Sequence, residues 1–211
     1  MLLSCLTRGC AVVCLLFATA LFAQETPTDA AARPLTVAVT AGGGYGAYAG
    51  DWFNGFSTEP NLWGAVRLGT GGRGWLTFAY RRQGGGSAPI GVHPPEVDPV
   101  DTDVDLHLDE YLMMVGLPTA RLGTSRHVPY AEFGLSILHR VASLDAEDPG
   151  FSTTSETKLG LVLQLGGLIA LRESMVLDVG VDMIHKPGIV LDDGPGGTIV
   201  GAHVGIGWIK R

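Results

Sequence analysis

The chain has almost no cysteine. Its three cysteines are Cys5, Cys10 and Cys14, and all lie in the N-terminal stretch MLLSCLTRGCAVVCLLFATALFAQE. This stretch has one basic residue, Arg8, followed by an apolar run that ends in small residues, which is the layout of a secretory signal peptide. We expect cleavage after Ala20 or Ala23. The remaining chain has no thiol, which excludes disulfides, cysteine nucleophiles and thiolate metal sites.

Long apolar runs are also missing after this stretch. A membrane-spanning helix needs about 18 or more consecutive apolar residues, and no such run follows residue 23. Yet the mean hydropathy is +0.26 and 46% of the residues are hydrophobic. The chain is therefore apolar without encoding a spanning helix, and its 211 residues suffice for one domain or one small barrel.

Positive charge is scarce. The full chain has 14 basic and 21 acidic residues, and without Arg8 of the signal segment 13 basic residues remain, a net charge of −8. This balance argues against nucleic acid as a partner.

What the chain does have is a two-residue alternation, clearest between residues 159 and 185. Leu161, Leu163 and Leu165 fall on one side, and the other side carries Gly residues with Gln164 and, after a break at residues 172–174, Asp178 and Asp182. A period of two indicates β-strands. A face of glycines with a few charges is a poor coat for water, so we expect it to line a closed barrel while the aliphatic face meets lipid.

The alternation recurs in eight segments. They are 35–46, 61–69, 74–83, 108–121, 128–140, 157–172, 174–185 and 197–209. The pattern is weaker in 61–69 and 108–121, and the phase of 108–121 is chosen so that Gly116 points inward.

The connections between these segments alternate between long and short. The long ones are 47–60, 84–107, 141–156 and 186–196, and the short ones are 70–73, 122–127 and the turn at Glu173. Such alternation with an even strand number is typical of outer-membrane barrels. We therefore predict an all-β fold, an eight-stranded antiparallel up-and-down transmembrane barrel over 35–211, after a signal peptide (1–23) and a periplasmic segment (24–34).

On this pattern the chain resembles the small eight-stranded outer-membrane barrels, the group that contains outer-membrane protein X and the transmembrane domain of outer-membrane protein A. The resemblance covers nearly the whole chain after the signal and rests on no short motif. It implies a monomer in the bacterial outer membrane, with both termini periplasmic, that contacts membrane lipid and lipopolysaccharide and is inserted by the barrel assembly machinery. One departure is the C-terminus, where the aromatic residue Trp208 lies three residues before the end.

The predicted interior is polar. An eight-stranded barrel is just wide enough for side chains to fill it, so we expect no open pore. The inward polar residues are Arg67, Arg81, Glu132, Gln164, Asp178, Asp182 and His203. Buried charges need partners, and we expect the two arginines to pair across the lumen with Glu132, Asp178 or Asp182. A proton or ion path through these groups is the less favoured alternative.

The predicted outer loops carry two further features. In 47–60, the aromatic residues Trp52, Phe53 and Phe56 can contact lipopolysaccharide or a partner, or can fold down on the barrel rim. In 84–107, three carboxylates repeat at the spacing of calcium loops, namely Asp101, Asp103 and Asp105. The calcium pattern fails at Leu106 and Leu112. We expect no resident cofactor, and favour a solvated acidic loop over a loosely bound divalent cation.

Five aromatic residues lie near predicted strand ends. They are Trp63, Trp75, Tyr80, Tyr111 and Trp208. Aromatic side chains at these positions can lie at the level of the lipid headgroups. Ordinary packing within the barrel is an equally good interpretation for each.

The preferred function is a non-enzymatic outer-membrane barrel with a structural, adhesive or surface-interaction role. The first alternative is a lipid-modifying enzyme of the outer membrane. A deacylase of this kind has His two residues before Ser, and none of the six histidines is followed by Ser at that spacing. A looser pairing of His139 with Ser143 remains as a weak candidate. The second alternative, a secreted lipocalin-like carrier, requires an apolar lumen, which is the opposite of the predicted one.

Overall fold

The computed structural model describes residues 35–53, 56, 58–69, 74–92, 100–120, 125–144, 154–187 and 196–210, with the backbone alone at 59, 85–92, 100–105, 142–144 and 154. The strands are β1 (Thr36–Ala49), β2 (Glu59–Gly69), β3 (Trp75–Val92), β4 (Val100–Pro118), β5 (His127–Leu144), β6 (Thr154–Ala170), β7 (Met175–Lys186) and β8 (Gly197–Lys210), and one short 3-10 turn, η1 (Asp51–Phe53), follows β1. The signal peptide and the segment 24–34 lie outside the described residues. Within the described part, no helix has the length and apolar character that crossing a membrane requires.

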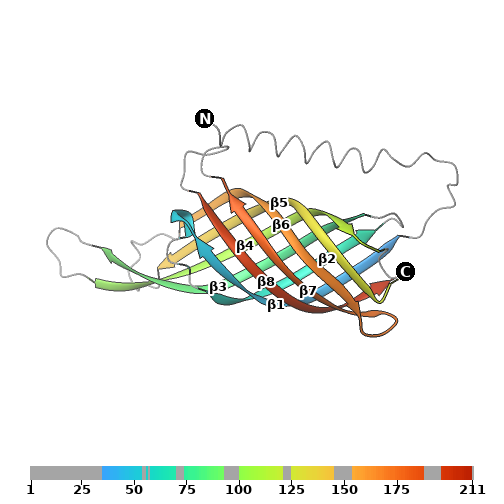
Figure 1. Ribbon diagram of the computed structural model, residues 1–211. Coiled ribbons are helices and arrows are strands. Elements are labelled where there is room, and N and C mark those ends of the chain that lie inside the picture. Colours follow the sequence, from blue (N-terminus) through green and yellow to red (C-terminus); the bar gives the residue numbers. More distant parts are fainter. Residues whose placement is uncertain are drawn as a thin grey trace, which may run out of the picture.

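The eight strands form one closed antiparallel barrel in which each strand pairs with its neighbours in the sequence and β8 pairs with β1 (Figure 1). At the closing seam, Thr40 of β1 lies opposite Gly207 of β8, and on its other side Thr40 lies opposite Ala65 of β2. The predicted eight-stranded up-and-down barrel is therefore confirmed.

The barrel has two different ends. At the turn end, on the right in Figure 1, β2, β4 and β6 connect to the strands that follow them, and β1 starts and β8 finishes there. Strands β1, β3, β5 and β7 finish at the opposite end, which we call the loop end. The predicted alternation of connections thus corresponds to the two ends of one barrel.

The strands on one side of the barrel extend further toward the loop end than the sequence indicated. β3 and β4 remain paired out to Val92 opposite Val100, so most of the predicted loop 84–107 is a β-hairpin. Asp101, Asp103 and Asp105 accordingly belong to strand β4, and their side chains lie outside the described residues. The β4 half, VDTDVDLHL over 100–108, does alternate apolar or β-branched residues with Asp and His. The prediction failed because the partner half, GGGSAP over 84–89, has the glycines and proline that are typical of loops, and because the repeated aspartates were interpreted as an acidic loop.

The alternation of residues along the strands places side chains inside and outside the barrel as predicted. Aliphatic and aromatic side chains stand exposed on the outer wall in a continuous belt. Its members are Val39, Leu62, Leu76, Phe78, Met113, Leu135, Ile137, Leu159, Leu161, Leu163, Leu165, Val181, Met183, Val200, Val204 and Ile206. Such an outer belt over a polar interior is the arrangement of membrane-spanning barrels.

Two of the five aromatic residues are not at the outer wall. Trp63 and Trp75 point inward and are buried, so for them the headgroup interpretation is wrong and packing inside the barrel is right. Tyr111 and Trp208 are exposed outside, at 50% and 61%. The inward position of the two tryptophans follows from the phase of β2 and β3, which places them on the same face as Arg67 and Arg81.

Candidate functional site in the barrel interior

Two buried arginines organise the interior. The first, Arg67 on β2, donates from Nε to Glu132 Oε1 on β5 at 3.0 Å and from Nη1 to Asp178 Oδ2 on β7 at 2.7 Å. Its Nη2 donates to the hydroxyl of Tyr130 at 3.0 Å. These contacts join three strands across the lumen, and both carboxylate partners belong to the set expected from the sequence.

The carboxylates around Arg67 also receive hydrogen bonds from uncharged groups. Glu132 Oε1 accepts from the indole of Trp75 at 2.5 Å and from the hydroxyl of Thr77 at 2.6 Å. Asp178 accepts from the hydroxyls of Thr40 at 3.0 Å and Tyr130 at 2.8 Å. We call this group the Arg67 cluster; its members are Arg67, Glu132, Asp178, Thr40, Trp75, Thr77 and Tyr130. Burial of its charges is offset by several donors, which buried ions require.

The second arginine, Arg81 on β3, lies closer to the loop end. Its Nε donates to Glu110 Oε2 at 2.7 Å, and its Nη1 lies 2.9 Å from each carboxylate oxygen of Asp182. We call these three residues the Arg81 cluster. Glu110 was not among the predicted partners. Its strand, β4, carries apolar residues on both faces, such as Leu112 inside and Met113 outside, so the alternation there is weak.

His203 on β8 lies between the two clusters. Its Nε2 is 3.7 Å from Asp178 Oδ1, and its Nδ1 is 4.0 Å from Asp182 Oδ1. The imidazole stacks on Trp63 at a centroid distance of 4.3 Å. Neither ring nitrogen is within hydrogen-bond distance of a partner among the described residues. His203 therefore lies between the two aspartates without forming a hydrogen bond to either.

Glutamine and glycine complete the polar interior. Gln164 donates from Nε2 to the Tyr130 hydroxyl at 3.0 Å, which ties β6 to the Arg67 cluster. Inward glycines stand where the large side chains need room. A Cβ at Gly116, Gly166, Gly180 or Gly201 would collide with the side chain of Trp75, Tyr130, His203 or Arg81, respectively. Small residues thus make the interior wide enough for its polar groups, as the sequence indicated.

Apolar side chains pack beside the polar groups. Toward the turn end, Ala38, Val128, Leu168 and Val176 pack together with Trp75 and Tyr130. A larger apolar cluster includes Leu108, Leu112, Met114, Leu138, Val162, Ile184 and Ile199. On β4 its members lie on both sides of Glu110, so apolar side chains are interspersed with the polar groups inside the barrel.

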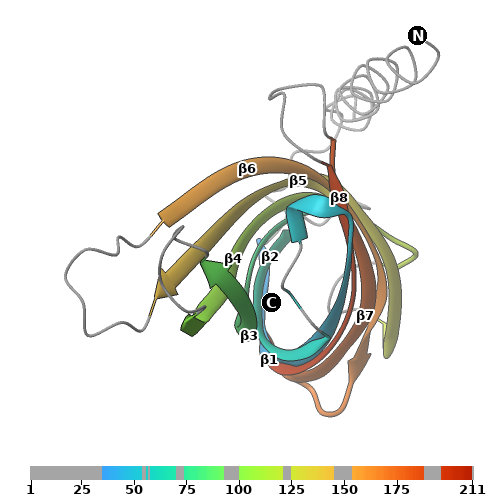
Figure 2. The same ribbon diagram turned by 90° about the vertical axis from the view of Figure 1, so that its left-hand side faces the viewer.

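The short turn η1 packs onto the larger apolar cluster. Trp52 and Phe53 are only 2% exposed, which places both side chains down on the barrel rim. The Trp52 indole donates to Glu156 at 2.9 Å, and Arg140 donates to the Trp52 carbonyl at 2.7 Å. We call Tyr48, Trp52, Phe53 and Phe56 the mouth cluster, because they pack together at the loop end of the barrel, the end that faces the viewer in Figure 2.

The metal site and the catalytic pairing considered from the sequence involve side chains outside the described residues. No group of three or more His, Cys, Asp or Glu side chains among the described residues is placed to hold a metal ion. His139, the weak candidate base, contacts the Thr157 hydroxyl at 2.8 Å, and the side chain of Ser143 lies outside the described residues.

No family model and no curated relative matches the sequence. Solved structures do match. The attachment invasion locus protein Ail of Yersinia pestis, solved with the heparin analogue sucrose octasulfate, aligns at a TM-score of 0.54 and 12% identity over 83% of this chain and 99% of Ail. The chain has the fold of the small outer-membrane β-barrels. A major outer-membrane protein of Thermus thermophilus also shares this outer-membrane barrel fold, at a TM-score of 0.52 and 12% identity over 83% of this chain and 99% of that protein.

Proposed function

We propose that this protein is a bacterial outer-membrane barrel with a closed interior, and that its role, structural, adhesive or in another surface interaction, is carried by the loop end. The observation that carries the proposal is the inverted sheet, with an aliphatic belt outside and buried ion pairs inside. A water-soluble barrel has no physical reason for this arrangement, whereas the acyl chains of a membrane provide the apolar surroundings that the outer belt requires.

Gel mobility after membrane fractionation tests this location. Closed outer-membrane barrels resist unfolding by SDS until they are boiled, so the unboiled and boiled protein should run at different positions. We expect such a heat-modifiable band in the outer-membrane fraction. Protein recovered in the soluble periplasm, with a band that does not shift, would contradict the proposal and favour the lipocalin-like carrier.

The orientation we propose places the loop end outside the cell and both termini in the periplasm. Short connections at the turn end support it, because periplasmic turns of such barrels are short. Since the chain after the expected signal has no cysteine, a single introduced cysteine can report which side of the membrane each end of the barrel faces. A membrane-impermeant maleimide on intact cells should label Asp51→Cys at the loop end and should leave Glu173→Cys unlabelled until the cells are lysed. The opposite labelling pattern would reverse the orientation.

A closed interior predicts negligible ion conductance. The two ion-pair clusters, the two apolar clusters and the mouth cluster all contribute buried side chains to the interior, which supports this proposal. We expect purified, folded protein to give no stable conductance steps in planar lipid bilayers, with a porin as a positive control. Stable channels of porin size would refute the closed interior.

For the loop end, a surface interaction is better supported than catalysis. His139, the weak candidate base, pairs with a threonine and not with a serine in the described part, and the interior carboxylates that the structure describes are engaged with arginines. The sulfated ligand bound by Ail is a polyanion, and the acidic balance of this chain does not favour the same ligand here. The lipid and lipopolysaccharide around the belt and a barrel assembly machinery that inserts it remain the partners we propose, for a protein that acts as a monomer.

A further inference from the structure

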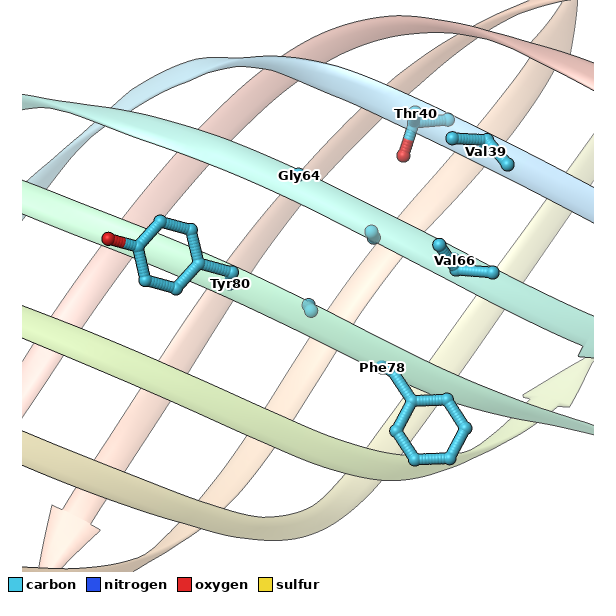
Figure 3. A pocket seen from close by; sticks show the side chains of 8 residues that line it. Val39, Thr40, Gly64, Val66, Phe78 and Tyr80 are labelled. Atoms are coloured by element: carbon cyan, nitrogen blue, oxygen red, sulfur yellow. The ribbon is translucent and has the colours of Figure 1, made fainter.

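The outer wall of the barrel has a groove that results from a missing side chain and not from the geometry of the strands. The groove has a volume of about 350 Å³ and lies over Gly64 of β2 (Figure 3). Val39 and Val66 stand on one side, and Phe78 and Tyr80 of β3 stand on the other. All four side chains are apolar where they line the groove, so its surface suits a hydrocarbon chain.

Glycine at position 64 is what opens this groove. Gly64 points outward and lies opposite Ala41 of β1 and Tyr80 of β3. A Cβ built on Gly64 would meet a single neighbouring atom, the Thr40 carbonyl oxygen at 3.8 Å, which is an ordinary contact. The strand geometry therefore tolerates a larger residue at position 64. Strands generally disfavour glycine, and the missing side chain has its clearest effect on the shape of the outer wall.

A cationic side chain lies next to the loop-end side of the groove. Arg82, two residues after Tyr80 on the same face of β3, has a side chain that is 49% exposed. Its Nε is 3.9 Å from Asp109 Oδ1, and the Tyr80 hydroxyl donates to the same oxygen at 2.6 Å. Asp109 itself is 12% exposed. The carboxylate is thus held against the wall by Tyr80, while the guanidinium remains accessible.

We propose that the groove binds one membrane lipid with a net anionic, phosphate-bearing headgroup, with an acyl chain over Gly64 and the phosphate on Arg82. The proposal rests on the proposed function, because it requires this wall to face lipid. Arginine is well suited to phosphate through its planar set of donors, and cationic residues at a membrane surface attract anionic lipids. The apolar groove and the adjacent cation match the two parts of such a lipid.

A second copy of the barrel fits this surface less well. Two barrels inserted in the same direction would meet about a twofold axis normal to the membrane, with equivalent residues at the same height. The groove would then face a groove, and Arg82 would face the Arg82 of the other copy. Neither the shape nor the charge of the surface is complementary to itself.

Native mass spectrometry of the purified, detergent-folded full-length protein tests the site. The protein is titrated with dioleoyl phosphatidylglycerol, which is anionic, and with dioleoyl phosphatidylcholine, which carries a phosphate but no net charge. Gly64→Leu fills the groove, and Gly167→Leu is its control, since Gly167 of β6 also points outward and a Cβ there meets no atom within 4 Å. Arg82→Gln removes the cation, and Arg172→Gln at the exposed β6–β7 turn is its control.

We expect wild-type protein to bind phosphatidylglycerol in preference to phosphatidylcholine. Gly64→Leu should weaken the binding of both lipids, and Arg82→Gln should raise the Kd for phosphatidylglycerol roughly three- to fivefold, as for one partly exposed ion pair, and abolish the preference. Both control variants should bind as wild type does. Every variant is first checked for the heat-modifiable band, so that a folding defect is not read as a binding defect.

Three results would overturn the proposal. One is equal binding by Gly64→Leu and wild type, and another is equal binding of the two lipids by wild type. The third is a Gly64→Leu variant that changes only the ratio of monomer to dimer, which would assign the groove to a second copy. Failure of the outer-membrane location would appear separately in the fractionation, because the lipid titration uses purified barrel.

Discussion

The Arg67 and Arg81 clusters contain the same charges but differ in what surrounds them. Each has one arginine between two carboxylates, all buried. In the Arg67 cluster, Glu132 and Asp178 also receive hydrogen bonds from the indole of Trp75 and from three hydroxyls. In the Arg81 cluster, the hydrogen bonds that the structure describes on Glu110 and Asp182 all come from Arg81. The two glutamates are alike in one respect, since Glu110 Oε1 and Glu132 Oε2 each have no partner among the described residues.

This difference indicates that the stability contributed by similar buried ion pairs can depend on their arginine to different degrees. A buried carboxylate that keeps neutral donors remains partly solvated by the protein when its cation is removed, whereas one that loses its only donor bears the full desolvation cost. Loss of the cation should therefore cost more stability in the Arg81 cluster, although that cluster makes fewer contacts.

The largest effect is expected for Arg81→Met. This substitution leaves Glu110 and Asp182 without the donor that now serves both, and we expect a loss of about 3–5 kcal/mol in the free energy of unfolding. Urea unfolding of the barrel in lipid vesicles, followed by the heat-modifiable band, measures it.

A combined variant separates the charge effect from the loss of packing. Adding Glu110→Gln and Asp182→Asn to Arg81→Met removes all three charges, and most of the lost stability should return, because an uncharged set of similar volume avoids the desolvation cost. A triple variant as unstable as the single one would show that the arginine acts through packing.

A smaller effect is expected for Arg67→Met, about 2–3 kcal/mol, because the Trp75, Thr77, Thr40 and Tyr130 donors remain on its two carboxylates. The same urea unfolding gives the value, and Arg172→Met at the exposed turn serves as the control for loss of an arginine. A loss for Arg67→Met greater than that for Arg81→Met would reverse the comparison.

The smallest change in stability is expected when a single uncharged hydrogen-bond donor is removed. Trp75→Phe removes the indole hydrogen bond to Glu132 and should cost about 1–2 kcal/mol. Trp63 provides a matched control, since its indole nitrogen is buried without a partner among the described residues, and Trp63→Phe removes no hydrogen bond that the structure describes. Equal losses for the two variants in urea unfolding would mean that ring volume, and not the hydrogen bond, sets the stability.

Much of the interior could be predicted from the sequence because alternation has a strict period. Once Leu161, Leu163 and Leu165 are assigned outward, Gln164 must point inward, and the same reasoning places Asp178 and Asp182. Alternation gives only the face, however, so it could name a set of partners for each arginine but not the pairs.

The remaining features depend on contacts between segments far apart in the chain. Trp52 lies in the mouth because Glu156 and Arg140 hold it there, at sequence separations of 104 and 88 residues. In the long β3–β4 hairpin the β4 half alternates as a strand does, but the glycines and the proline of the β3 half are typical of loops. Local sequence signals do not record the position of Trp52, and they conflict over the hairpin.

The pairing of β1 with β8 has a consequence for how the barrel comes into being. Seven of the eight strand pairings join neighbours in the sequence, whereas this one brings the first strand to the last, with Val37 opposite Lys210. Joining distant segments carries the greatest loss of chain entropy, so we expect hairpins to form early and the seam to close last. Until then the growing sheet has two open edges that can pair with other chains. A chain stopped before β8 would keep those edges, and self-association of such a truncated chain, seen by cross-linking, is the sign to look for.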